Sequence, residues 1–355
     1  MKKKVLFSIS MAYLNDLSAL LSSMVRFESG EFLDFYLIVS YIKQKDEELL
    51  RDLFYKIFGD SSLTVIDARS LTAIHEVLTL FSDDRSRFLW QALTFIEQAE
   101  FSDKILYLDV KTITMHSLDP FFSFELGQHL LAGSLYAMDD FHKNQSLVEI
   151  AMQEDNAFML EQLVYSGSLS ASALLIQVDR WKARRCTSNF LIFLRKFPRK
   201  LFRSMALEDV LYYYLLHRED SIYYLPVNYN SVDLYYPNSV SDNKLSSLTV
   251  RKNIERHLSD ERSVEPKLIS DTIYVLTLKF PGKYVPHHYA SHYHSLLRDL
   301  LGENMMLYNR KFQIVSMFFR IKDLVKRVLS RPSKVTVLLV LYSLGLCVGL
   351  CILLF

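Results

Sequence analysis

The sequence predicts an α/β fold followed by one helix that spans a membrane. Three observations support this: short apolar runs alternate with helical patterns, half of the 355 residues are hydrophobic, and residues 335–355 carry no charge. A chain of this composition can bury a core, and alternating strands and helices are typical of a sheet covered by helices. A collagen-like, coiled-coil or disordered chain is excluded by the same composition.

The elements follow in a regular order. Apolar runs predict strands over 4–10, 32–39, 63–66, 104–108, 130–138, 171–178 and 273–278. Apolar residues at helical spacing predict helices over 15–26, 45–58, 87–99, 180–196 and 207–217. Residues 223–236 are expected to be extended and residues 239–265 to form a polar loop. The alternation favours parallel strands, whose carboxyl ends meet at one edge where ligands usually bind.

Charge and cysteine content exclude several classes of protein. Lys+Arg 41 against Asp+Glu 40 leaves a net charge of +1, so there is no overall positive field to attract nucleic acid. Three cysteines do not make a disulfide framework. A basic stretch over 182–203 is interleaved with phenylalanines, and we expect it to face anionic lipid rather than nucleic acid.

The uncharged run 335–355 predicts a membrane anchor. As a helix it would be about 31 Å long, close to the ~30 Å hydrocarbon core of a bilayer. Residues 301–334 form an amphipathic, basic juxtamembrane segment, which favours the cytoplasmic side and anionic headgroups. Gly345 and Gly349 have the spacing of a helix-dimerisation pair. We expect a single-pass protein with its globular part in the cytoplasm; the alternative is a buried C-terminal helix.

Several local patterns, taken in order, resemble glycosyltransferase family 8. They lie at 104–109, 117–122, 173–181, 207–211 and Asn228. The resemblance covers roughly residues 3–300. It implies a GT-A domain over 1–300, with a Rossmann-like mixed sheet flanked by helices, that transfers a hexosyl unit from a nucleotide sugar with retention of configuration.

The family's metal motif differs here. The resemblance implies an Asp-x-Asp motif whose carboxylates hold a divalent cation on the donor diphosphate, but this chain has Asp109-Val110-Lys111. Mn²⁺ and Mg²⁺ prefer oxygen ligands, and an ammonium group cannot ligate them. We therefore expect no resident metal or cofactor, with a UDP-sugar as the candidate donor. Lys111 either supplies positive charge to the diphosphate or, as we expect, forms a salt bridge or a solvated strand end.

Other donor-site positions of the family are also altered. The expected arginine falls at Ala92, and the Asp-Gln pair falls at Leu207-Glu208. The remnant of the nucleotide-sugar site that the resemblance implies consists of Ser10, Ala12, Tyr13, Asp109, Lys111, Ser170, Ser172 and Lys283.

Three acids are candidate catalytic residues. Glu208 lies at the start of a predicted helix, where the helix dipole favours acids in any case. Asp139 and Asp140 follow a predicted strand, and the alternative for them is a loop residue that caps a helix. Two hypotheses stay open. The first is a membrane-anchored hexosyltransferase acting on a cell-surface glycan or lipid-linked acceptor. The second is an inactive scaffold or regulatory subunit, paired with a second copy or with an active glycosyltransferase.

Overall fold

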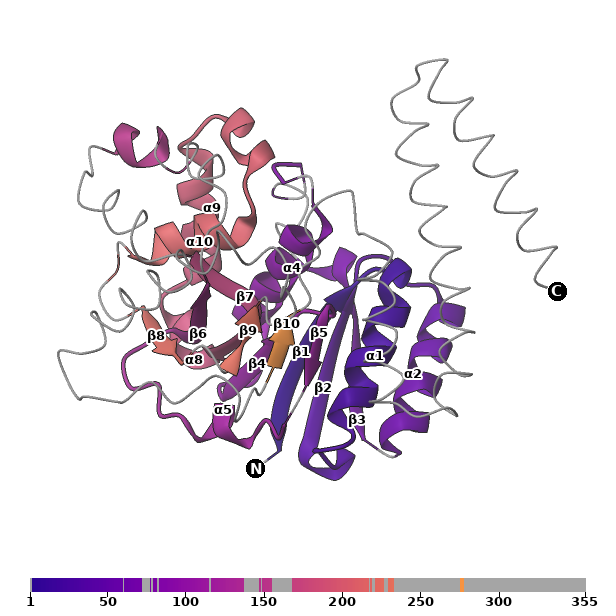
Figure 1. Cartoon of the computed structure of the whole chain (residues 1–355). Helices are drawn as coiled ribbons and strands as arrows, with labels where there is room; N and C mark the ends of the chain where they lie inside the picture. Colours follow the sequence, from indigo (N-terminus) through magenta and orange to yellow (C-terminus); the bar gives the residue numbers. More distant parts are fainter. Residues whose placement is uncertain are drawn as a thin grey trace, which may run out of the picture.

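A mixed β-sheet organises the described part of the chain (Figure 1). The computed structural model describes residues 2–59, 61–71, 77, 79–81, 83–114, 116–136, 147, 149–154, 168–216, 218, 221–226, 229–232 and 275–277. The strands lie in the order β3 (Ser62–Asp67), β2 (Leu33–Val39), β1 (Lys3–Ile9), β4 (Lys104–Leu108), β7 (Ser168–Gln177), β6 (Leu131–Tyr136) and β8 (Ile222–Leu225). A small second sheet has the order β5 (Thr112–Thr114), β10 (Val275–Thr277) and β9 (Ser231–Val232).

One strand runs against its neighbours. β1 pairs in parallel with β2 and β4, whereas β7 is antiparallel to both β4 and β6. The parallel sheet expected from alternation alone is therefore wrong at β7, and the mixed sheet implied by the family resemblance is confirmed. The reversal brings the start of β7 to the carboxyl end of β4, where Leu108 pairs with Ala173.

The helices cover both faces of the sheet. One face carries α4 (Asp84–Gln98), α8 (Val178–Ala183), α9 (Cys186–Arg195) and α10 (Leu207–Leu216). The other carries α1 (Leu14–Met24), α2 (Gln44–Phe58) and α5 (Asp119–Ser123). Successive strand residues point to opposite faces, so Ile105 and Tyr107 enter the first core while Leu106 and Leu108 enter the second. This two-sided burial explains the nearly continuous apolar strands.

Most predicted elements are confirmed, with shifts at their ends. Gly59 ends α2 with φ +67°, as expected. The single helix expected over 180–196 is wrong: Arg185 adopts left-handed backbone angles (φ 47°) and separates α8 from α9. Residues 223–236 contribute to β8 and β9, and 273–278 contain β10.

Several predictions fall outside the described residues. They are the loop over 239–265, Asn228, Asp139, Asp140, Lys283, the juxtamembrane segment 301–334 and the anchor 335–355. In the portion of the chain that the structure does describe, no helix has both the length and the apolar character needed to cross a membrane.

A buried ion pair fastens the first strand to the loop before α5. The Lys3 ammonium lies 2.5 Å from the Glu28 carboxylate and 2.6 Å from that of Asp119. The second oxygen of Glu28 accepts hydrogen bonds from the Leu118 amide and the Ser117 hydroxyl. Burial alone would lower the pKa of Lys3, but the hydrogen bonds to Asp119 and Glu28 outweigh it and raise that pKa.

We predict that Lys3→Met destabilises the fold by about 3 kcal/mol, because it leaves the Glu28 carboxylate buried without its cation. Asp119→Asn is the matched control: its side chain is 72% exposed, so its loss should cost at most about 1 kcal/mol. Urea unfolding of both variants measures the difference. Equal decreases in unfolding free energy for the two variants would show that the burial of Glu28 does not determine the effect of Lys3→Met.

Candidate active site

The carboxyl end of β4 forms a tight polar turn. The Asp109 amide donates to the Ser172 carbonyl on β7 (2.8 Å), and Asp109 Oδ1 accepts a hydrogen bond from the Lys111 amide (3.0 Å). The Thr112 hydroxyl donates to the Asp109 carbonyl at 2.7 Å. The Asp109 side chain is buried, whereas Lys111 is exposed.

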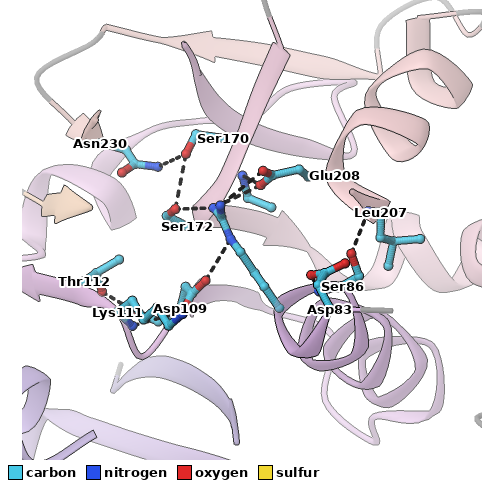
Figure 2. A network of polar contacts seen from close by, with 12 residues as sticks. Asp83, Ser86, Asp109, Lys111, Thr112, Ser170, Ser172, Leu207, Glu208 and Asn230 are labelled. Atoms are coloured by element: carbon cyan, nitrogen blue, oxygen red, sulfur yellow. Dashed lines mark hydrogen bonds and ion pairs between the residues drawn. The ribbon is translucent and has the colours of Figure 1, made fainter. Parts of the chain in front are cut away.

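A single arginine, Arg85, joins the buried acids Asp109 and Glu208, which are labelled in Figure 2. Arg85 Nε lies 2.9 Å from Asp109 Oδ2, and the two terminal nitrogens of Arg85 contact the Glu208 oxygens at 3.1 Å and 3.0 Å. Arg85 also donates to the Ser172 hydroxyl, and the Ala171 amide donates to Glu208 at 3.2 Å. We call Arg85, Asp109 and Glu208 the Arg85 clamp. Its two-pronged contact with Glu208 is the geometry in which an arginine–carboxylate pair is strongest.

Helix capping holds the clamp in place. Asp83 caps α4, with its carboxylate accepting from the Ser86 amide at 2.7 Å. The Ser86 hydroxyl in turn accepts from the Leu207 amide at the start of α10 (2.8 Å). The N-termini of α4 and α10 are thereby tied together, which sets Arg85 opposite Glu208.

A buried row of hydroxyl and amide groups lies beside the clamp. The Ser170 hydroxyl donates to that of Ser172 (3.3 Å), and the Asn230 amide donates to Ser170 (2.9 Å) (Figure 2). All three side chains are buried. The sequence analysis singled out Asn228, which lies outside the described residues, and did not single out Asn230, two residues later in the chain.

The end of β1 supplies another group to the same edge. Ser10 precedes the short helix η1 (Met11–Tyr13), and Ala12 is buried within it. The Tyr13 hydroxyl donates to Asp84 at 2.9 Å, and the Lys111 ammonium lies 5.5 Å from the centre of the Tyr13 ring. Tyr13 and Lys111 therefore lie together, and their assignment to a nucleotide-sugar site stays a prediction.

Burial is pronounced around the clamp. Tyr107, on β4, is fully enclosed, and this burial, reinforced by the nearby charge of Asp109, raises the pKa of its phenol well above the usual value. The clamp charges therefore interact in surroundings that screen them poorly.

The described side chains do not fit a hard divalent cation. Both Asp109 oxygens are engaged, one by Arg85 and one by the Lys111 amide, and the side chain two residues after Asp109 is the ammonium of Lys111, which cannot ligate such a cation. Among the described residues, no group of three or more His, Cys, Asp or Glu is placed to hold a metal ion.

We predict that Arg85→Met lowers the free energy of unfolding by about 3–5 kcal/mol, because it leaves two buried carboxylates without their cation. Arg87→Met on the same helix is the control. Its partly exposed pair with Asp84 (3.2 Å) should contribute at most about 1 kcal/mol.

The double variant Arg85→Met/Glu208→Gln tests the pairing directly. Its loss in unfolding free energy should be smaller than the sum of the losses of the two single variants. The reason is that Glu208→Gln removes one of the carboxylates that Arg85→Met leaves without a cation. Strict additivity in denaturant unfolding would contradict the clamp.

Three solved glycosyltransferases share the fold. Galactosyltransferase LgtC, solved with donor and acceptor sugar analogs, is 15% identical; the match covers 84% of this chain and 95% of that chain, with a TM-score of 0.56. Mouse xyloside xylosyltransferase 1 is 10% identical over 80% of this chain and 99% of that one, with a TM-score of 0.53. GlyE from Streptococcus pneumoniae TIGR4 is 15% identical, with a TM-score of 0.50; the match covers 91% of this chain and 64% of GlyE.

Sequence comparison identifies the family. No curated protein is similar enough in sequence to match the chain. The model of glycosyl transferase family 8 matches residues 4–264, a span that includes all but the first residue of β1, the Arg85 clamp and Asn230. The chain therefore belongs to glycosyl transferase family 8.

Proposed function

We propose that the protein transfers a hexosyl unit from a nucleotide sugar, with a UDP-sugar as candidate donor, to a cell-surface glycan or lipid-linked acceptor. Family membership supports the class of reaction. The structure of LgtC with donor and acceptor sugar analogs supports a site that receives both substrates. The polar groups at the carboxyl ends of β1 and β4 lie where α/β sheets usually bind their ligands.

The proposal includes a donor site in which Lys111 replaces a metal ion. The observation that carries it is the engagement of Asp109 by Arg85, with the exposed Lys111 two residues later. The charge of Arg85 is offset by two carboxylates, whereas the ammonium of Lys111 stands at the surface. An ammonium group attracts phosphate oxygens as a point charge and needs no ligand cage.

Glu208 acts in this proposal as a positioning residue. Both of its oxygens contact Arg85, and one also accepts the Ala171 amide, so its carboxylate orients the guanidinium and the start of β7. Asp139 and Asp140 remain the proposed acids for the sugar.

We also propose that residues 335–355 anchor the protein in a membrane, with the domain over 1–300 on the cytoplasmic side and the basic segment 301–334 at the headgroups. An anchor would hold the site near a lipid-linked acceptor and raise its local concentration.

A non-catalytic role is the second candidate function. The pairing within the Arg85 clamp favours it, because both buried carboxylates already contact Arg85 without any substrate. Such a protein would act as a scaffold or a regulatory partner of an active glycosyltransferase.

We predict that the full chain in detergent binds UDP-hexoses in the presence of EDTA, as measured by calorimetry. Lys111→Ala should weaken binding by about 10-fold to 100-fold, the usual range for losing a hydrogen bond to a charged group. Lys111→Asp should weaken binding at least as much and should not make it depend on Mn²⁺, since Arg85 still engages Asp109.

Lys45→Ala is the control, because Lys45 is exposed on α2 and should not affect binding. Unchanged affinity of Lys111→Ala would remove the proposed role of Lys111. Absence of any nucleotide-sugar binding at millimolar concentration would favour the non-catalytic role.

A further inference from the structure

Residues 180–207, which contain α9, carry a large local excess of positive charge. This stretch contains nine lysines and arginines and no acid, in a chain whose total charges nearly cancel. It spans most of α8, all of α9 and the short helix η4 (Arg199–Ser204). A segment of this kind creates a local positive field that the net charge of +1 conceals.

Part of this positive charge is engaged by the protein itself. Arg180 donates to the Gln128 side chain at 2.6 Å, and Lys182 donates to the Ala99 carbonyl. Glu97, an acid of α4 beside this stretch, caps α9 by accepting the Thr187 and Ser188 amides at 2.6 Å and 3.2 Å.

The remaining cations stay at the surface. Arg184, Lys196, Arg199 and Lys200 are exposed, and no ion pair within the described residues involves them. Ile192 lies among them and is 55% exposed, on the helix face that it shares with Ser188 and Arg195. We call Arg184, Ile192, Lys196, Arg199 and Lys200 the α9 surface.

The aromatic residues of the same stretch point inward. Phe190, Phe193, Phe197 and Phe202 are all buried in the core with Trp90 and Tyr214. Proteins that bind single-stranded nucleic acid stack bases on exposed aromatic rings, and the described part of this stretch has none. An exposed aliphatic side chain surrounded by lysine and arginine instead matches a lipid interface, where the aliphatic group enters the acyl boundary and the cations meet headgroups.

We propose that the α9 surface docks on a membrane containing anionic lipids. Charge complementarity with the headgroups carries the proposal, and each basic residue near such a surface contributes about fivefold in affinity. This contact is separate from the proposed C-terminal anchor and from the donor site. It would fix which way the domain faces the bilayer.

Acetylation of lysines on the full chain tests the proposal. We expect vesicles of phosphatidylglycerol and phosphatidylcholine to slow acetylation of Lys196 and Lys200, read by peptide mass spectrometry, by about threefold or more. Pure phosphatidylcholine vesicles should not slow it. Lys45 and Lys56 on α2 are internal controls, because α2 covers the other face of the sheet (Figure 1), and their rates should stay unchanged.

A variant separates the α9 surface from any C-terminal anchoring. In Arg184→Gln/Arg199→Gln, the loss of two basic residues should weaken this contact on the order of 25-fold and abolish the protection of Lys196 and Lys200. The charge-matched control Arg26→Gln/Arg51→Gln, with both arginines exposed on the α1 and α2 side, should retain it.

Three outcomes would overturn the proposal. They are equal acetylation of Lys196 and Lys200 with both kinds of vesicle, equal slowing at Lys45 and Lys56, and protection by single-stranded RNA without protection by anionic vesicles. The last outcome would assign the surface to nucleic acid.

Discussion

The guanidinium of Arg85 lies between two buried carboxylates, and four structural elements meet around it. Asp109 directly follows β4, Glu208 lies in the first turn of α10, and Ser172 belongs to β7, while Arg85 itself comes from the first turn of α4. Two carboxylates at this depth would repel each other without the cation. The turn after β4 and the joined N-termini of α4 and α10 therefore depend on a single charge.

This arrangement also determines what the site can bind. A hard cation at Asp109 would have to displace Arg85 and lie near the ammonium of Lys111, against both its ligand preference and its charge. The negative charge of a diphosphate would instead be attracted by the ammonium of Lys111. The fold is shared with LgtC, but fold alone does not set chemistry. In the proposed function, the charge of Lys111 takes the place of a metal ion.

The strands and most helices could be predicted because burial leaves a periodic pattern in the sequence. Arg85 could not: the helix was expected to begin at Arg87, and the arginine was sought at Ala92, whereas the Asp83 cap starts α4 at Asp84. Ala92 lies seven residues after Arg85, almost two full turns, so both positions lie on nearly the same helix face. The direction of β7 could not be predicted from the sequence either. A strand buried on both faces is a run of apolar residues whether it is parallel or antiparallel to its neighbours. The break at Arg185 depends on a left-handed conformation that arginine rarely adopts.

Exposure, rather than composition, decides which charges act on ligands. The acids at the sheet edge are buried and paired with Arg85, so they add little to the outer field. The cations of Lys111 and of the α9 surface are exposed, and no ion pair within the described residues involves them. A net charge near zero thus conceals two separate positive regions. Phosphate groups are common to nucleotide sugars and to lipid headgroups, so one simple electrostatic preference suits both the donor and the membrane on which an acceptor would reside.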